Sequence, residues 1–189
     1  MEAQPGAHVV ILLSGGIDSA ALLEFYRERG SSVRTVYVDY GQPAGKAERR
    51  SAAALSKHFG FGRLATLRLG TALPRDAHGE YFGRNLLLIL LAAAAGGTGP
   101  VIVAAGVHAG TRYFDCSEAF AELARRVLDG YSGGRVALDV PFLTWSKQEI
   151  VEYCRARKVP LELTHSCEMA AQPCGACPSC LDRRTLGVE

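Results

Sequence analysis

The sequence lacks three features that mark other classes of protein. It has no apolar run long enough to span a membrane, no excess of positive charge of the kind that binds nucleic acid, and no basic N-terminal stretch of the kind found in export signals. Its longest apolar run, residues 86–95, is about half the ~20 residues of a membrane-spanning helix. The formal net charge is only +2, and the basic residues are scattered rather than massed. The first residues carry Glu2 and no basic stretch. We therefore expect a cytoplasmic protein with neither a membrane nor a nucleic-acid partner.

The 189 residues, 48% of them hydrophobic, are enough to bury a substantial core. Apolar runs predict strands, and longer stretches with helical spacing predict helices between them. The predicted strands are residues 9–13, 33–38, 64–69, 101–105 and 135–140, and the predicted helices are a first one from Asp18 and then 44–59, 84–95, 117–129 and 145–158, the last capped by Thr144 or Ser146. This alternation predicts an α/β fold with a doubly wound parallel sheet.

The most informative stretch is VVILLSGGIDS at residues 9–19. Residues 9–13 have no polar alternation, which is typical of a strand covered on both faces. The Ser-Gly-Gly at 14–16 then turns the chain into a helix that begins near Asp18 and Ser19. Free N–H groups and the dipole at a helix start favour an anion, glycine lets it approach closely, and serine hydroxyls can donate to phosphate. The alternative is a glycine turn in an ordinary strand–helix unit.

Two other loops are predicted to border the same pocket. Residues 39–42 (DYGQ) and 106–115 each follow a predicted strand, as residues 14–19 do. The carboxyl ends of parallel strands meet at one edge of a sheet, where ligands bind near the switch point. Cys116 follows the second loop, but only this position argues for a nucleophilic role.

Four of the six cysteines lie in the last 23 residues. They are Cys167, Cys174, Cys177 and Cys180, spaced C-x6-C-x2-C-x2-C. Four thiolates this close along the chain suit tetrahedral zinc, and a site filled by protein ligands has a structural role. An iron–sulfur cluster and a redox CxxC pair are the alternatives. His165 is a weaker candidate for a substitute ligand, and Cys154 is expected to be a small buried hydrophobe.

The order of these motifs resembles the 7-cyano-7-deazaguanine synthase family. SGGIDS is not a Walker loop, because GxxxxGK[ST] is absent, and it resembles the PP-loop of the ATP pyrophosphatase superfamily. Other strings similar to the family pattern are DYGQ at 39–42, GRN at 83–85, AGV at 105–107, DC at 115–116, the PFL and K-x-EI strings within 141–150, and THSC at 164–167 with CGxCxxCxxR at 174–183. Each string is short, but together they cover most of the chain in the family's order.

The resemblance implies a fold and a reaction. The fold is Rossmann-like, of the adenine nucleotide alpha-hydrolase type, with a PP-loop ATP-binding domain at 1–160 and a zinc-binding segment at 161–189 packed on it. Family members use ATP, with Mg²⁺, to adenylate the carboxylate of 7-carboxy-7-deazaguanine. Ammonia then displaces AMP to give the amide, and a second activation yields the nitrile. The implied partners are a small-molecule carboxylate, ammonia and a second copy of the chain in a homodimer.

The resemblance also implies residue roles. The expected catalytic residues are Ser14, Asp18, Ser19, Arg84 and Lys147. The expected nucleotide-binding residues are Leu13, Ser14, Gly15, Gly16, Ile17, Asp18, Ser19, Asp39, Tyr40, Gly41, Gln42 and Gly106. The expected substrate-binding residues are Arg84, Asn85, His108, Arg112, Tyr113 and Asp115, and the zinc ligands are the four cysteines already named.

Each of the charged residues has a plainer alternative. Asp18 would cap its helix instead of orienting magnesium, and Asp39 would close a turn instead of meeting the adenosine. Arg84 would be a solvated side chain at a turn, and Lys147 would lie on the exposed face of a helix.

The substrate region departs from the family pattern. Only residues 71–82 stand where the family has a longer segment before GRN, and HAGTRYFDC at 108–116 replaces its usual residues. We therefore expect the ATP half to be kept and the substrate half to be altered. Two other hypotheses are a paralogue that adenylates another small or macromolecular carboxylate, and a non-enzymatic nucleotide-binding or zinc-stabilised interaction protein.

Overall fold

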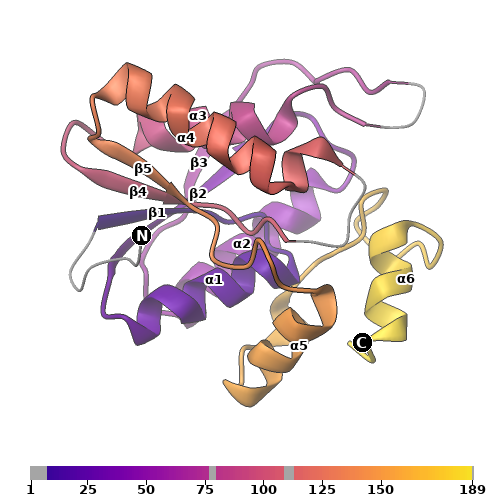
Figure 1. The fold of residues 1–189 in the computed structure, drawn as a ribbon. Coiled ribbons are helices and arrows are strands. Elements are labelled where there is room, and N and C mark those ends of the chain that lie inside the picture. Colours follow the sequence, from indigo (N-terminus) through magenta and orange to yellow (C-terminus); the bar gives the residue numbers. More distant parts are fainter. Residues whose placement is uncertain (1–7, 77–79, 109–112, 189) are drawn as a thin grey trace.

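The computed structural model describes residues 8–76, 80–108 and 113–188, and its strands form one parallel sheet (Figure 1). The spatial order is β3-β2-β1-β4-β5. The strands are β1 (His8–Leu12), β2 (Ser32–Asp39), β3 (Ala65–Arg68), β4 (Val101–Ala104) and β5 (Val136–Asp139). The strands β1, β2 and β3 follow one another toward one edge of the sheet, and β4 and β5 then continue from β1 toward the other edge. The topological switch point, where the strand order reverses, therefore lies between β1 and β4. The predicted doubly wound α/β fold is confirmed.

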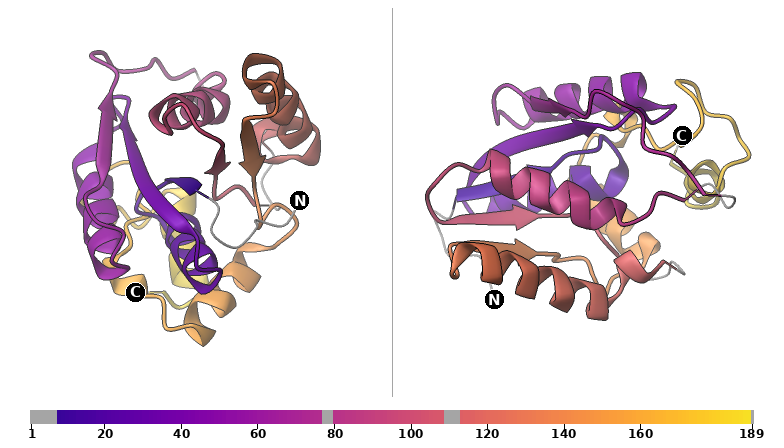
Figure 2. Two further views of the ribbon diagram at one scale, coloured as in Figure 1. Left: turned by 90° about the vertical axis from the view of Figure 1, so that its left-hand side faces the viewer. Right: turned by 90° about the horizontal axis from the view of Figure 1, so that it is seen from above.

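Helices cover both faces of the sheet (Figures 1 and 2). One layer contains α1 (Ile17–Glu28) and α2 (Gly45–His58), with α5 (Lys147–Ala156) packed on α1. The other contains α3 (Arg84–Ala95) and α4 (Glu118–Ser132). Each layer encloses a hydrophobic cluster against its face of the sheet. The polypeptide therefore forms three layers, as expected for helices that connect parallel strands.

The central strand β1 explains why residues 9–13 are apolar without alternation. Val9 and Ile11 pack into the cluster under α1, whereas Val10 packs into the cluster under α3, and all three are fully buried. Val10 lies level with Arg34 of β2 and Val103 of β4, so β1 is hydrogen-bonded on both sides. This position fixes the loop that follows β1 at the middle of the sheet edge.

The predicted helices lie within a few residues of the observed ones. Ser146 rather than Thr144 caps α5, and its side chain and that of Glu149 form a reciprocal capping box. Short 3-10 turns occur at Phe114–Cys116 (η1) and Leu161–Leu163 (η2). An additional helix, α6 (Pro178–Thr185), was not expected; Pro178 at its first turn favours the helix start.

The helix α6 lies outside both helix layers, at the right in Figure 1. Beyond it, Val188 returns to the cluster under α1, where it is almost completely buried. Among the described helices, none has the length and apolar character needed to cross a bilayer.

Candidate functional site

A cavity of about 350 Å³ opens where the strands end. Its walls come from the loops after β1, β2 and β4, from the first residues of α1, α3 and α5, and from the segment that carries the cysteines. The predicted site residues that line it are Leu13, Ser14, Gly16, Ile17, Asp18, Ser19, Tyr40, Gln42, Arg84, Asn85, Gly106, His108, Tyr113 and Lys147. Gly15, Asp39, Gly41 and Asp115 are not among the lining residues, and Arg112 lies outside the described residues.

Hydrogen bonds to the side chains of its own serines fix the conformation of the loop at residues 14–19. The Ser14 and Ser19 hydroxyl oxygens lie 3.2 Å apart. The N–H of Gly15 donates to Ser19 Oγ at 3.2 Å, and the N–H of Gly16 donates to Ser14 Oγ at 3.3 Å. The N–H groups of residues 17–19, in the first turn of α1, have no carbonyl partner within that helix. The Ser19 hydroxyl in turn donates to the Gly16 carbonyl oxygen at 3.0 Å. The loop therefore offers an anion its helix-start N–H groups and the Ser14 hydroxyl.

Two glycines are required by close packing around this loop. Gly15 has a φ of +87°, and a Cβ added there would lie 2.6 Å from the Glu48 carbonyl oxygen. A Cβ at Gly106 would lie 3.0 Å from the Asp18 Cβ, so the loop after β4 packs directly on the start of α1. At both positions the lack of a side chain lets two backbone segments pack closely, and Gly106 itself lines the cavity.

The Asp18 carboxylate is paired with the Lys147 ammonium, with 2.6 Å from Nζ to each oxygen. His108 Nε2 lies 4.0 Å from Asp18 Oδ2. The residue at the cap position of α1 is Gly16, so Asp18 does not act as the helix cap. Lys147 is only 23% exposed and lines the cavity, so it does not lie on an exposed helix face.

The DYGQ turn holds a half-buried glutamate, Glu48, and does not present Asp39 to the cavity. Asp39 accepts a hydrogen bond from the Gly41 N–H at 3.2 Å and so closes the turn. Gln42 accepts from the Tyr40 N–H through Oε1 at 2.9 Å and donates through Nε2 to Glu48 Oε2 at 2.7 Å.

Glu48 was missed by the sequence analysis, and it lines the cavity. Burial raises its pKa, although hydrogen bonds from Gln42 and Tyr37 and the nearby His165 and Arg84 favour the carboxylate. Its place six residues after Gln42, in the first turn of the following helix, is the only sequence signal that could have indicated it.

Arg84 and Asn85 begin α3 after Gly83, whose φ is +63°. Burial disfavours the charged Arg84 guanidinium, but Tyr40 and Asp115 outweigh this cost and raise its pKa. Asn85 Nδ2 donates to the Asp115 carbonyl oxygen at 3.1 Å, which ties α3 to η1. Arg84 therefore belongs to the cavity wall and is not a solvated side chain at a turn.

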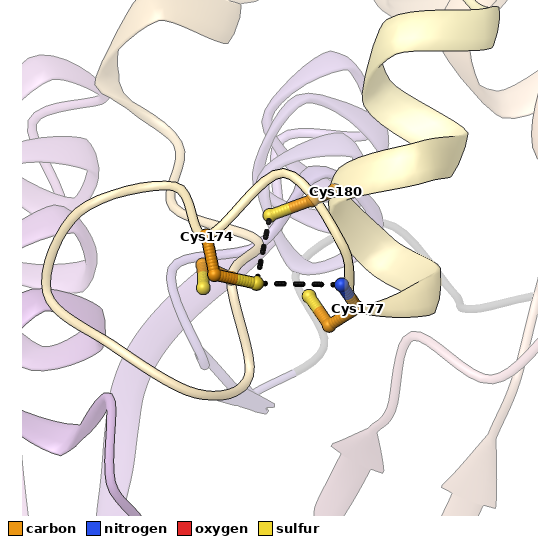
Figure 3. A group of neighbouring side chains, drawn as sticks. Cys174, Cys177 and Cys180 are labelled. Atoms are coloured by element: carbon orange, nitrogen blue, oxygen red, sulfur yellow. Dashed lines mark hydrogen bonds between the residues drawn. The ribbon is translucent and has the colours of Figure 1, made fainter.

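The four cysteines near the carboxyl terminus form one cluster, and Figure 3 labels Cys174, Cys177 and Cys180. Their sulfur atoms all lie within 4.8 Å of one another. Tetrahedral zinc with Zn–S bonds near 2.3 Å needs sulfur atoms about 3.8 Å apart, so the set fits one ion and leaves little room for iron and sulfide. Hydrogen bonds from the N–H groups of Ala176 and Cys177 lower the pKa of Cys174 to about 6, whereas burial raises the pKa of Cys177. A bound cation would hold all four as thiolates.

The other sulfur and imidazole candidates have different surroundings. His165 Nε2 lies 3.1 Å from the carbonyl oxygens of Cys167 and Ala170, so the ring donates to backbone and is outside the ligand set. Cys154 is fully buried in the core, as expected, and burial raises its pKa to about 12. Cys116 lines the cavity with its sulfur 3.9 Å from Asp115 Oδ1.

The segment that carries the cysteines also forms a cavity wall, which the sequence analysis did not predict. The residues that contribute are His165, Ser166, Glu168, Ser179, Asp182 and Arg183. The backbone N–H of His165 donates to the Gly15 carbonyl oxygen at 2.8 Å. The segment that carries the cysteines is therefore hydrogen-bonded to the loop at 14–19, and both line the same cavity.

Known proteins resemble this chain over nearly its whole length. Residues 8–77 and 79–187 match the family described as queuosine biosynthesis protein QueC. The 7-cyano-7-deazaguanine synthase of Aquifex aeolicus is 33% identical, over 93% of this chain and 94% of that protein. The synthase of Methanoculleus marisnigri is 32% identical, over 95% of each.

A solved structure from Methanocaldococcus jannaschii, described as a predicted subunit of tRNA methyltransferase, has a TM-score of 0.50 at 13% identity. It covers 79% of this chain and 74% of that one, and this likeness concerns the fold alone. The family match spans the loop at 14–19, the cavity and the cysteine cluster together. The chain therefore belongs to the family of the queuosine biosynthesis protein QueC.

Proposed function

We propose that this chain is a 7-cyano-7-deazaguanine synthase that uses ATP to convert 7-carboxy-7-deazaguanine and ammonia to the nitrile. Family membership and the names of the relatives support the product. The observation that carries the use of ATP is the anion-binding loop at 14–19, which opens into a cavity of about 350 Å³. A cavity of this size lies within the ~300–1,000 Å³ range of small-molecule sites.

The first step forms a bond between a carboxylate oxygen of the substrate and the α-phosphorus of ATP, and breaks the bond to the β-phosphate. Pyrophosphate leaves with the electron pair and with added negative charge. The Ser14 hydroxyl and the N–H groups of residues 17–19 are the donors suited to that charge. The Ser19 hydroxyl would join them by giving up its hydrogen bond to the Gly16 carbonyl oxygen. Lys147 supplies a cation at the same wall, held in place by Asp18.

Ammonia then attacks the acyl carbon, AMP leaves and a proton is lost, which gives the amide. A second ATP adenylates the amide oxygen, with loss of pyrophosphate and of one N–H proton. Loss of AMP and of the other N–H proton then gives the nitrile. Each activation therefore releases one AMP and one pyrophosphate. Arg84 and Asn85 lie on the cavity wall formed by α3, where a guanidinium can bind a carboxylate through two hydrogen bonds.

The donor sets fit the implied metals. Magnesium usually takes one or two protein carboxylates and several phosphate oxygens. Asp18 is a carboxylate at the anion loop, and it would hold the ion by giving up one of its two contacts with Lys147. The ion would neutralise charge on the phosphates. Zinc would be held by the four cysteines in a structural role. From the resemblance we also infer a cytoplasmic homodimer.

The test uses purified protein with ATP, Mg²⁺, ammonium and 7-carboxy-7-deazaguanine. We expect AMP, pyrophosphate and a product with the mass of the amide or nitrile, all dependent on the acid. Ser14→Ala and Asp18→Ala should slow AMP release. AMP release with a different acid but not with this one would instead identify a paralogue, and ATP binding without turnover of any acid would indicate a non-enzymatic protein.

A further inference from the structure

We propose that Arg183, on the carboxyl-terminal helix α6, binds the phosphate groups of the nucleotide. The segment that carries the cysteines would then supply one of the charges of the nucleotide site, in addition to its structural role. This inference rests on the proposed function, because it requires that ATP binds at the loop formed by residues 14–19.

The argument begins with residues 164–166, which lie against that loop. The His165 N–H donates to the Gly15 carbonyl oxygen at 2.8 Å. A Cβ added at Gly16 would lie 3.7 Å from the His165 carbonyl oxygen, so the two backbones are in close contact. Groups attached to residues 164–166 are therefore neighbours of the anion-binding loop.

Arg183 is attached to this segment by its side chain. Its Nη1 donates to Thr164 Oγ1 at 2.6 Å and lies 3.3 Å from Ser166 Oγ. Arg183 lines the same cavity as Ser14 and Lys147. Two hydroxyls thus fix one end of the guanidinium at the cavity wall, beside the loop.

The rest of the guanidinium is available to a ligand. Within the described parts of the chain, Nε and Nη2 of Arg183 make no hydrogen bond, and no carboxylate forms an ion pair with this side chain. Neither nitrogen is among the sealed polar atoms without a partner, so both reach open space. An arginine with free donors on a cavity wall is the group best suited to bind phosphate through two hydrogen bonds.

The charge of Arg183 is not offset by a protein carboxylate, unlike that of other cavity cations. Lys147 is paired with Asp18, and Arg84 lies near Asp115. Burial lowers the pKa of Arg183, so keeping it charged at this wall has a free-energy cost. A bound anion would recover that cost.

A rival role is to balance the negative charge of a zinc–thiolate cluster, because Cys180 lies three residues earlier on α6. The rival role predicts that loss of Arg183 lowers the zinc content of the protein. The proposal predicts instead that it weakens nucleotide binding, and more so for a nucleotide with more phosphate groups. These two properties can be measured separately on the same protein.

The experiment compares full-length, zinc-loaded Arg183→Gln and Arg183→Lys with Arg184→Gln, which removes the charge of the exposed neighbour. Titration calorimetry gives the Kd for ATP and for AMP, and a colorimetric chelator assay gives the zinc content. We expect Arg183→Gln to weaken ATP binding by roughly 10- to 100-fold, as for a lost charge-assisted pair, and AMP binding by less. Arg183→Lys should recover part of the loss, and Arg184→Gln should bind as the wild type does.

Wild-type ATP affinity in Arg183→Gln would overturn the inference and leave the proposed function intact. Loss of zinc from both Arg183→Gln and Arg183→Lys would assign the arginine to the cysteine cluster and would also overturn it. If the wild-type protein itself bound no ATP, the proposed function would fail and the inference with it.

Discussion

Lys147 at the start of α5 contacts both carboxylate oxygens of Asp18 at the start of α1, although the two residues are 129 positions apart. The two side chains are 23% and 22% exposed, so water screens the pair only in part. The contact ties two helices together at the edge of the cavity. It also places a cation on the cavity wall.

This pair gives the first prediction. Lys147→Met should slow acid-dependent AMP release by on the order of 10²-fold, because it removes a cation from the developing charge. It should lower the free energy of unfolding by only about 1 kcal/mol, since the pair keeps some contact with water. AMP release and urea denaturation measure the two effects. Lys46→Met, at an exposed position of α2, is the matched control and should change neither. A loss of activity no greater than the loss of folded protein would contradict a direct role.

The second prediction concerns Gly15. Its φ of +87° and the Glu48 carbonyl oxygen, 2.6 Å from any added Cβ, leave no room for a side chain. Gly15→Ala should lower the free energy of unfolding by about 2–5 kcal/mol, from backbone strain plus overpacking. Gly30 also has a positive φ, +63°, but nothing within 4 Å of an added Cβ. Gly30→Ala therefore isolates the strain, at roughly 1–2 kcal/mol. Equal losses in the two variants would show that the contact with Glu48 is unimportant.

The third prediction concerns the metal. The wild-type protein should contain one zinc ion per chain, and Cys177→Ser or a strong chelator should remove it. ATP affinity should fall with the zinc, because His165 and Arg183 lose their support at the cavity wall. The far-UV circular dichroism of the sheet and its helices should largely persist. Cys116→Ser, outside the cluster, should keep its zinc. A zinc-free protein that bound ATP with full affinity would contradict this coupling.

The fourth prediction concerns pH. Burial raises the pKa of Glu48 above its ordinary value of 4.5, so the folded protein holds this proton more tightly than the unfolded chain. The contribution of Glu48 to stability is therefore present at low pH and is lost as the pH rises above about 4.5. As the pH rises above about 4.5, the free energy of unfolding of Glu48→Gln should increase relative to that of the wild type. Urea denaturation at several pH values measures this difference. Glu122→Gln, at an exposed position of α4, controls for the lost charge. A stability difference that did not change with pH would contradict the prediction.

The fold could be predicted because its main signals are local. Residues 9–13 are apolar on both faces since β1 lies between two helix layers, and this pattern needs no knowledge of the partners. The reciprocal cap formed by Ser146 and Glu149 is likewise contained within four residues. Such signals give the order of elements and place the loop at 14–19 on the sheet edge.

The cavity wall contributed by the carboxyl-terminal segment could not be predicted in the same way. Residues 164–183 have no helical or strand period over most of their length, and their position depends on the His165–Gly15 hydrogen bond and on four converging sulfur atoms. The contact between Asp18 and Lys147 also joins segments that only the folded sheet brings together. The proposed catalytic and binding roles of individual residues, and the domain boundary at residue 160, stay predictions.

The wall formed by residues 165–183 has a consequence for synthesis. Translation produces the loop at 14–19 early, but the residues that complete its surroundings emerge last. A nascent polypeptide whose sheet had already formed would still lack this wall of the cavity. If the four cysteines bind a metal, as proposed, its capture would be the event that closes the cavity. Translation that stopped before Cys174 would therefore give a polypeptide with the residues of its central sheet but without a complete cavity wall.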